Sequence, residues 1–72
     1  MSVARVIEIS STSDKSFEDA IRQGIARVGK TMRHLRSAWI KEQEVQLDGE
    51  KIMAYKVNMM ITFVVEDTLG EE

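Results

Sequence analysis

The 72-residue sequence predicts an α+β fold in which one helix packs against a three-stranded antiparallel sheet. Two observations predict this fold. A Val- and Ile-rich segment precedes one amphipathic segment of helical period, and two strand-like segments follow, separated by an Asp-Gly turn. We expect a single domain over residues 1–72 in the order β-α-β-β, with the acidic tail at about 67–72 loose.

The composition restricts the classes of function. Cysteine is absent and histidine occurs once, so disulfides, thiolate zinc sites and histidine-rich metal sites are excluded. The net charge of −2 argues against a nucleic-acid partner, which requires a basic surface. The N-terminus has no apolar signal-peptide run and no segment has membrane-spanning length, so we expect a soluble cytoplasmic protein without a membrane partner.

The first two elements are predicted from residue type and spacing. Val and Ile dominate residues 3–9, and the Ser-Ser-Thr-Ser cluster that follows is expected to end this strand. A helix is predicted over Phe17–Met32, with Ser16 as its N-cap three residues before Asp19. Its apolar residues recur at helical spacing, at Phe17, Ala20, Ile21, Gly24, Ile25, Val28 and Met32.

Two long strands complete the predicted subunit, over Ser37–Leu47 and Lys51–Val65, with a hairpin turn at residues 48–50. Alternation in the last strand places six residues on one face: Tyr55, Val57, Met59, Ile61, Phe63 and Val65. One helix covers only part of one face of such a sheet, and long edge strands need partners. Because a core this small is marginal, we expect self-association.

A phosphate-loop pattern, G-x-x-x-x-G-K-[ST], is matched by residues 24–31. A functional loop of this kind follows a strand and opens a helix, so that free backbone N–H groups face the phosphate. Here the match lies inside the predicted helix, whose N–H groups are already bonded. We therefore interpret Gly24 and Gly29 as positions at which a neighbouring backbone approaches the helix closely.

Two groups of charged residues follow the helix. His34 lies near Lys30, Arg33 and Arg36, which would form either a small anion site or, as we favour, a solvated basic helix end. No orienting acid or pocket supports a general base, so no enzyme activity is expected. The second group is Glu42 and Glu44, two carboxylates on the same face of the predicted second strand. They could bind calcium, although we favour an exposed, charged strand face.

Trp39, the only tryptophan, lies in the most polar strand. Strict alternation would give it the same face as Ser37, Lys41, Gln43 and Val45, which is a poor core face. A partly exposed indole beside amide and charged groups suits a small planar ligand or a subunit interface. From the residues alone, a core or interface role is favoured over ligand binding.

The chain also resembles the dodecins, small flavin-binding proteins, from about Val3 to Asp67. The matching segments are Val6–Ile9 with Thr12-Ser13, Ser16–Ile21, Lys30–Leu35, Glu42-Gln43, Tyr55–Val57 and Thr62–Asp67. The resemblance implies a hollow homododecamer of β-α-β-β subunits with long strands partly wrapped around the helix. It also implies a non-enzymatic protein that stores FMN or riboflavin at subunit interfaces. A tryptophan stacks on the isoalloxazine ring, and a glutamine bonds its pyrimidine edge.

Both flavin-contact positions of this family are altered here. The tryptophan position falls on Ser37, two residues before Trp39, and the glutamine position falls on Lys56. The resemblance therefore predicts Trp39 as a shifted stacking platform, Lys56 near the phosphate or ring edge, and Gln43 as a replacement amide. The alternative is a dodecin-fold shell that has lost flavin and binds another small ligand, an ion such as calcium, or nothing.

Overall fold

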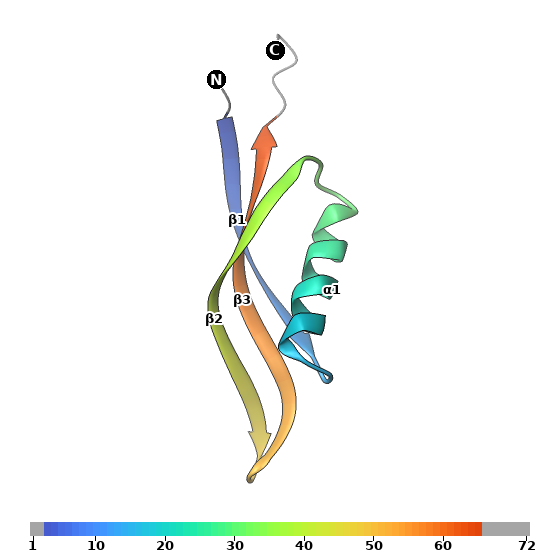
Figure 1. The fold of residues 1–72 in the computed structure, drawn as a ribbon, viewed down its shortest axis with the longest axis vertical. Helices are drawn as coiled ribbons and strands as arrows, with labels where there is room; N and C mark the ends of the chain where they lie inside the picture. The colour runs from blue at the N-terminus through green and yellow to red at the C-terminus, as the bar shows by residue number, and fades with distance from the viewer. Residues whose placement is uncertain (1–2, 66–72) are drawn as a thin grey trace.

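The computed structural model describes residues 3–65, which form a three-stranded antiparallel sheet with one helix on one side (Figure 1). The strand order is β1-β3-β2, so the last strand of the chain is central. The predicted fold class and element order are confirmed; the expected loose tail at about 67–72 lies outside the described residues. The elements are β1 (Val3–Ser13), α1 (Phe17–Gly29), β2 (Leu35–Asp48) and β3 (Lys51–Val65).

Three predicted boundaries are wrong by two or more residues. One is the start of β2, which lies at Leu35 rather than Ser37. The helix ends at Gly29 rather than Met32, because Lys30 and Thr31 turn back and donate their N–H groups to carbonyls three residues earlier. The first strand does not stop at Ile9 but continues to Ser13. Its serine and threonine residues remain extended because residues 10–13 pair with residues 55–58 of β3, and this pairing overrides their preference for turns.

The start of the helix is tied to the end of β1 by side-chain hydrogen bonds. Ser16 caps α1 as predicted, since its Oγ accepts from the Asp19 N–H at 2.9 Å. The buried Ser13 hydroxyl donates to the Asp19 carboxylate at 2.6 Å, and Gln23 donates to the same oxygen. The bond from Ser13 is the main reason that the pKa of Asp19 lies below its ordinary value. These contacts set where the helix leaves the sheet.

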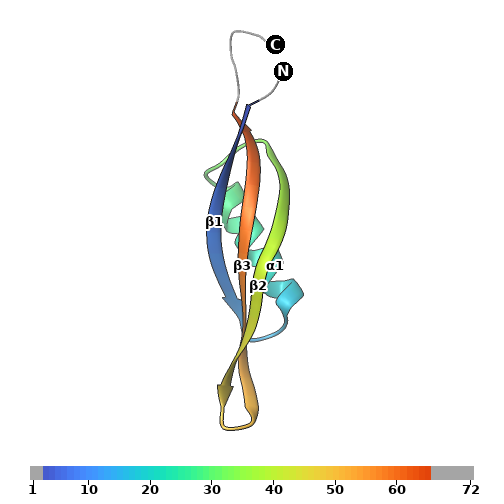
Figure 2. The ribbon, with the colours of Figure 1, turned by 90° about the vertical axis from the view of Figure 1, so that its left-hand side faces the viewer.

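The core lies between α1 and the central strand. Val57, Met59, Ile61 and Phe63 of β3 are buried together with Ala20 of the helix, which confirms the predicted apolar face of this strand. The helix packs on β1 and β3, and it lies behind the sheet when the opposite face is viewed, with only its first turns extending past the edge of β2 (Figure 2). We call the face away from the helix the outer face. No described element covers it.

The subunit is extended for its size. Its Cα radius of gyration is 15.1 Å, whereas a compact chain of this length would have about 11 Å. The β2–β3 hairpin continues past the end of β1 (Figure 1), and its outermost part exposes Leu47, Ile52 and Met53. A single subunit therefore leaves both the outer face and an apolar hairpin tip in solvent, which is the arrangement that self-association would cover.

Gly24 lies where the helix packs closely on the sheet. An added Cβ would lie 2.5 Å from Met59 Cε and 3.1 Å from Ser11 Cβ, so the helix is closely approached here, by side chains rather than by the backbone that was expected. At Gly29 the nearest such atom is Leu35 Cδ1 at 3.7 Å, an ordinary contact, so the same interpretation is wrong at that position. Both glycines lie in α1, and a helical backbone does not form a phosphate loop.

We expect Gly24→Ala to lower the free energy of unfolding by about 1 kcal/mol, because crowding that costs about 1–3 kcal/mol outweighs a gain in helix propensity of about 1 kcal/mol. The matched control, Gly29→Ala, should be neutral or slightly stabilising, since its methyl group meets only an ordinary contact. Urea unfolding at one fixed protein concentration measures both variants. Equal stability of the two would contradict the close-packing argument.

Candidate functional site

A β-bulge in β2 determines which side chains accompany the tryptophan. Ile40 pairs with Met59 and Glu42 pairs with Asn58, the next residue along β3. Lys41 is therefore an extra residue in β2 with no pairing residue opposite it on β3. One extra residue reverses the alternation of every position after it. The prediction that Gln43 and Val45 share a face with Trp39 is therefore wrong. They pair with Val57 and Tyr55, on the helix side of the sheet.

Trp39 lies on the outer face and is 53% exposed. It pairs with Met60 of β3, and Met60 pairs on its other side with Glu8 of β1, so the three form one row across the sheet. Residues directly opposite each other project from the same side of a sheet. The indole is therefore flanked by a thioether on the uncovered face of the subunit, away from the core.

Two polar pairs border this row. Lys41 Nζ lies 3.3 Å from Glu8 Oε2, which places the bulged lysine on the outer face and across the central strand. In the next row, Asn58 Nδ2 donates to Glu42 Oε1 at 3.0 Å. We call these six residues the indole platform: Glu8, Trp39, Lys41, Glu42, Asn58 and Met60. Its apolar centre and polar border suit a planar ligand that carries hydrogen-bonding groups at its edge.

Of the other predicted site residues, Ser37 lies beside Trp39, whereas Lys56 lies further along the sheet. Ser37 pairs with Thr62, one position from Trp39 on the same face, so the structure brings these two together. Lys56 also lies on the outer face, but it pairs with Glu44 and is four residues from Met60 along β3. That separation is about 13 Å. Within one subunit Lys56 therefore lies on the same face as the indole but three pairing rows from Ser37 and outside the indole platform.

The carboxylates of Glu42 and Glu44 face the same way, as alternation predicted, because their partners on β3 are also two residues apart. Glu42 is engaged by Asn58. Within residues 3–65, no group of three or more His, Cys, Asp or Glu side chains could hold a metal ion. A cation site built from these carboxylates would need ligands from further copies of the chain.

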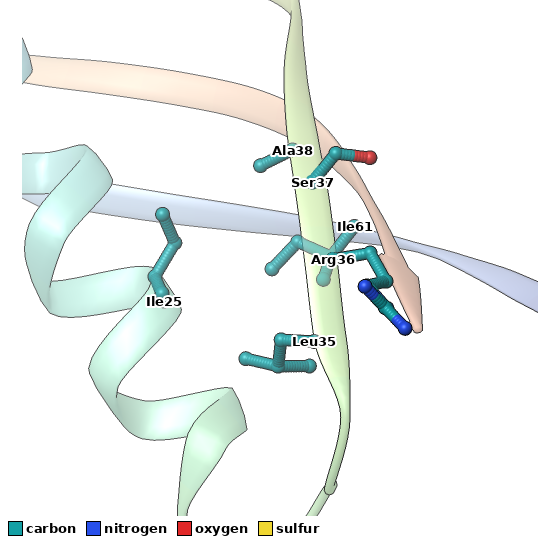
Figure 3. Close-up of a pocket in the computed structure, with 6 residues that line it drawn as sticks. All are labelled: Ile25, Leu35, Arg36, Ser37, Ala38 and Ile61. Carbon is teal, nitrogen blue, oxygen red and sulfur yellow. The ribbon is translucent and has the colours of Figure 1, made fainter. Parts of the chain in front are cut away.

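A hollow of about 240 Å³ lies on the helix side of the sheet (Figure 3). Leu35 and Ala38 extend from β2 toward α1, whereas the Ser37 hydroxyl points away from the helix. The apolar lining includes Ile25 and Ile61, which belong to the helix–sheet packing. This hollow is an incompletely filled edge of the core. It offers few groups that could orient a polar ligand.

The basic residues after the helix do not gather as one group. Arg33 and His34 line a hollow of about 340 Å³ with Arg5 and Phe63, while Arg36 lines the hollow beside α1 instead. Arg5 lies with its guanidinium carbon 5.9 Å from the centre of the Phe63 ring. His34 has a φ of 63°, and its carbonyl accepts from the Val64 N–H at 3.0 Å. The alternative of a four-residue anion site is therefore not supported, because Arg36 lines a different hollow from Arg33 and His34.

Sequence reasoning missed four members of the indole platform: Glu8, Glu42, Asn58 and Met60. Strict alternation placed Glu42 on the face opposite Trp39, and the bulge at Lys41 moves it to the outer face. Alternation does place Met60 and Asn58 on the second face of β3, so part of the signal was present. Their position beside Trp39 depends on the strand order and on the register of β2 against β3.

No described helix is long and apolar enough to cross a membrane.

Comparisons with known proteins agree with this architecture. A family model described as Dodecin matches residues 3–66. The dodecin of Thermus thermophilus is 32% identical over 66 residues, which cover 92% of this chain and 96% of that protein. The calcium dodecin of Mycobacterium tuberculosis is 30% identical over 63 residues, covering 88% of this chain and 89% of that protein.

Solved structures show the same fold. The dodecin of Streptomyces davaonensis superposes with a TM-score of 0.86 at 30% identity, covering 92% of this chain and 97% of that one. The crystal structure of the M. tuberculosis calcium dodecin, described as a calcium-chelating antigen with a novel calcium-binding site, gives a TM-score of 0.77 at 28% identity. That match covers 92% of this chain and 94% of the other.

Proposed function

The chain belongs to the dodecin family, and we propose that it binds FMN or riboflavin at the subunit interfaces of a homododecamer. The observation that carries the proposal is the exposed Trp39 on a sheet face that the helix does not cover. An indole that is half in solvent contributes little to the core. On the outer face, where a second copy would pack, it supplies a flat surface for an isoalloxazine ring.

In this proposal Trp39 stacks on the flavin ring, and the small Ser37 beside it leaves space for the ring along β2. Lys56 interacts with the far end of the ligand, where its ammonium group pairs with a phosphate or donates to a ring carbonyl. Gln43 has no role, since it faces the helix side. The protein sequesters and stores the flavin without transforming it.

The experiment is a titration of purified protein with riboflavin and, separately, FMN. We expect quenching of both flavin and protein fluorescence at micromolar protein or below, because stacked aromatic rings are in direct contact. The protein signal is specific, since Trp39 is the only tryptophan in the chain. Sedimentation of the same samples reports the assembly. Unchanged fluorescence of both partners with an intact oligomer would contradict flavin binding.

The second candidate is a shell of the same fold that binds an ion such as calcium instead of flavin. It is favoured by the two carboxylates that share the outer face, Glu42 and Glu44, and by the similarity to a protein named calcium dodecin. The same titration separates the two candidates. For the second, flavin fluorescence stays unchanged while added calcium raises the unfolding temperature, an effect that a chelator reverses.

A further inference from the structure

We propose that Asn58, held in place by Glu42, binds the imide edge of a flavin stacked on Trp39. This inference rests on the proposed function and adds a residue to it. The resemblance places Lys56 where flavin-binding dodecins carry a glutamine, and a lysine has no acceptor for the flavin ring N–H. If this chain binds flavin, another side chain must supply that acceptor.

The structure leaves one carboxamide near the indole. Among residues 3–65, Gln23 lies on α1, Gln43 faces the helix side, and Gln46 pairs with Ala54 toward the hairpin tip. Asn58 lies on the outer face in the row next to Trp39 and Met60. Two residues along β3 separate Asn58 from Met60, a distance of about 6.6 Å. A three-ring flavin that overlaps the indole extends over such a distance.

The contact with Glu42 determines how the carboxamide is oriented. An ionised carboxylate only accepts hydrogen bonds, so the Asn58 atom that lies 3.0 Å from Glu42 Oε1 is the donor Nδ2. Oδ1 therefore points away from Glu42, and Nδ2 retains a second hydrogen. The imide edge of a flavin presents an N–H between two carbonyls. One carboxamide can accept from this N–H and donate to one carbonyl, which is a matched bidentate pair.

The bulge supplies a donor for the remaining carbonyl. It turns Lys41 to the same side as the indole, where its ammonium group lies 3.3 Å from Glu8 Oε2. Glu8 engages one of the three ammonium hydrogens and leaves the others available. The polar border of the indole platform thus carries one acceptor and two donors, the set of groups that the imide edge requires. Glu42 acts as a positioning residue, because it orients Asn58 without touching the ligand.

The test compares riboflavin with 3-methylriboflavin, in which a methyl group replaces the imide hydrogen. We expect the wild-type protein to bind riboflavin about tenfold more tightly, the effect of one lost hydrogen bond at a desolvated site. Asn58→Ala should bind the two flavins with nearly equal affinity. Gln43→Ala is the matched control, since its amide lies on the opposite face, and it should keep the wild-type ratio.

Glu42→Gln provides a second variant of nearly unchanged volume in case Asn58→Ala fails to assemble. A neutral amide no longer dictates which end of Asn58 faces it, so the ratio should fall by roughly threefold. A tenfold preference that persists in Asn58→Ala would overturn the assignment while leaving flavin binding intact. Absence of binding of either flavin to the wild-type protein would instead overturn the proposed function, and this inference with it.

Discussion

Trp39→Ala is expected to weaken riboflavin binding by roughly 10- to 100-fold, because stacking of a planar base on an aromatic side chain contributes about 1–3 kcal/mol. The variant should fold, since the indole is 53% exposed in the subunit and lies outside the buried cluster. The readout is the fluorescence of riboflavin itself, because the substitution removes the only tryptophan of the protein. Sedimentation velocity confirms that the assembly is retained.

Trp39→Phe is the matched control for this prediction. A phenyl ring keeps an aromatic face with less overlap, so its affinity should lie between those of the wild type and Trp39→Ala. An unchanged riboflavin affinity in Trp39→Ala would show that the flavin does not stack on this indole. Loss of the oligomer in both variants would instead assign the indole to a subunit contact, the role that composition alone favoured.

Met59→Ala is expected to lower the free energy of unfolding by about 2–5 kcal/mol, through lost apolar contacts and the cavity left behind. Met59 is fully buried between β3 and α1, and its methyl group lies against Gly24. A chain of this size has a total stability of only about 4–11 kcal/mol. The change should therefore remove a large share of the total stability, measured as a lower midpoint of urea unfolding.

Met53→Ala makes the same chemical change at the hairpin tip, where the side chain is 49% exposed. Within a subunit it should change stability by no more than about 0.5 kcal/mol. If the tip packs against another copy, the effect of Met53→Ala will depend on protein concentration, since a subunit contact stabilises by mass action. Equal losses in the two variants at every concentration would contradict the placement of the core around Met59.

Much of the fold follows from patterns that are local in the chain. The apolar alternation of β3 identified its buried face, and Ser16 with Asp19 identified the start of the helix. The end of β1 was not predictable in this way. Its serines and threonine have the composition of a turn, and only their pairing with β3 keeps them extended.

The candidate site was predictable only in part. Trp39 and Ser37 were identified from one strand, and the structure places them side by side on the outer face. Gln43 was assigned to the wrong face, because a single bulged residue, Lys41, reverses the alternation and has no sequence signature of its own. Asn58 could not be predicted as a neighbour of the indole, because the two residues are distant in the chain and only strand pairing brings them together.

The sequence by itself determined the β-α-β-β order, the helix cap, the buried face of β3 and the dodecin family. The first three depend on periodicity and capping, which short stretches of chain encode, whereas the family follows from a resemblance that spans most of the chain. Only the tertiary structure decided which polar side chains surround Trp39. Their positions depend on the register of β3 against β2 and against β1, and β1 is separated from β3 in the chain by the helix and β2. One extra residue in a strand exchanges its two faces for all later positions.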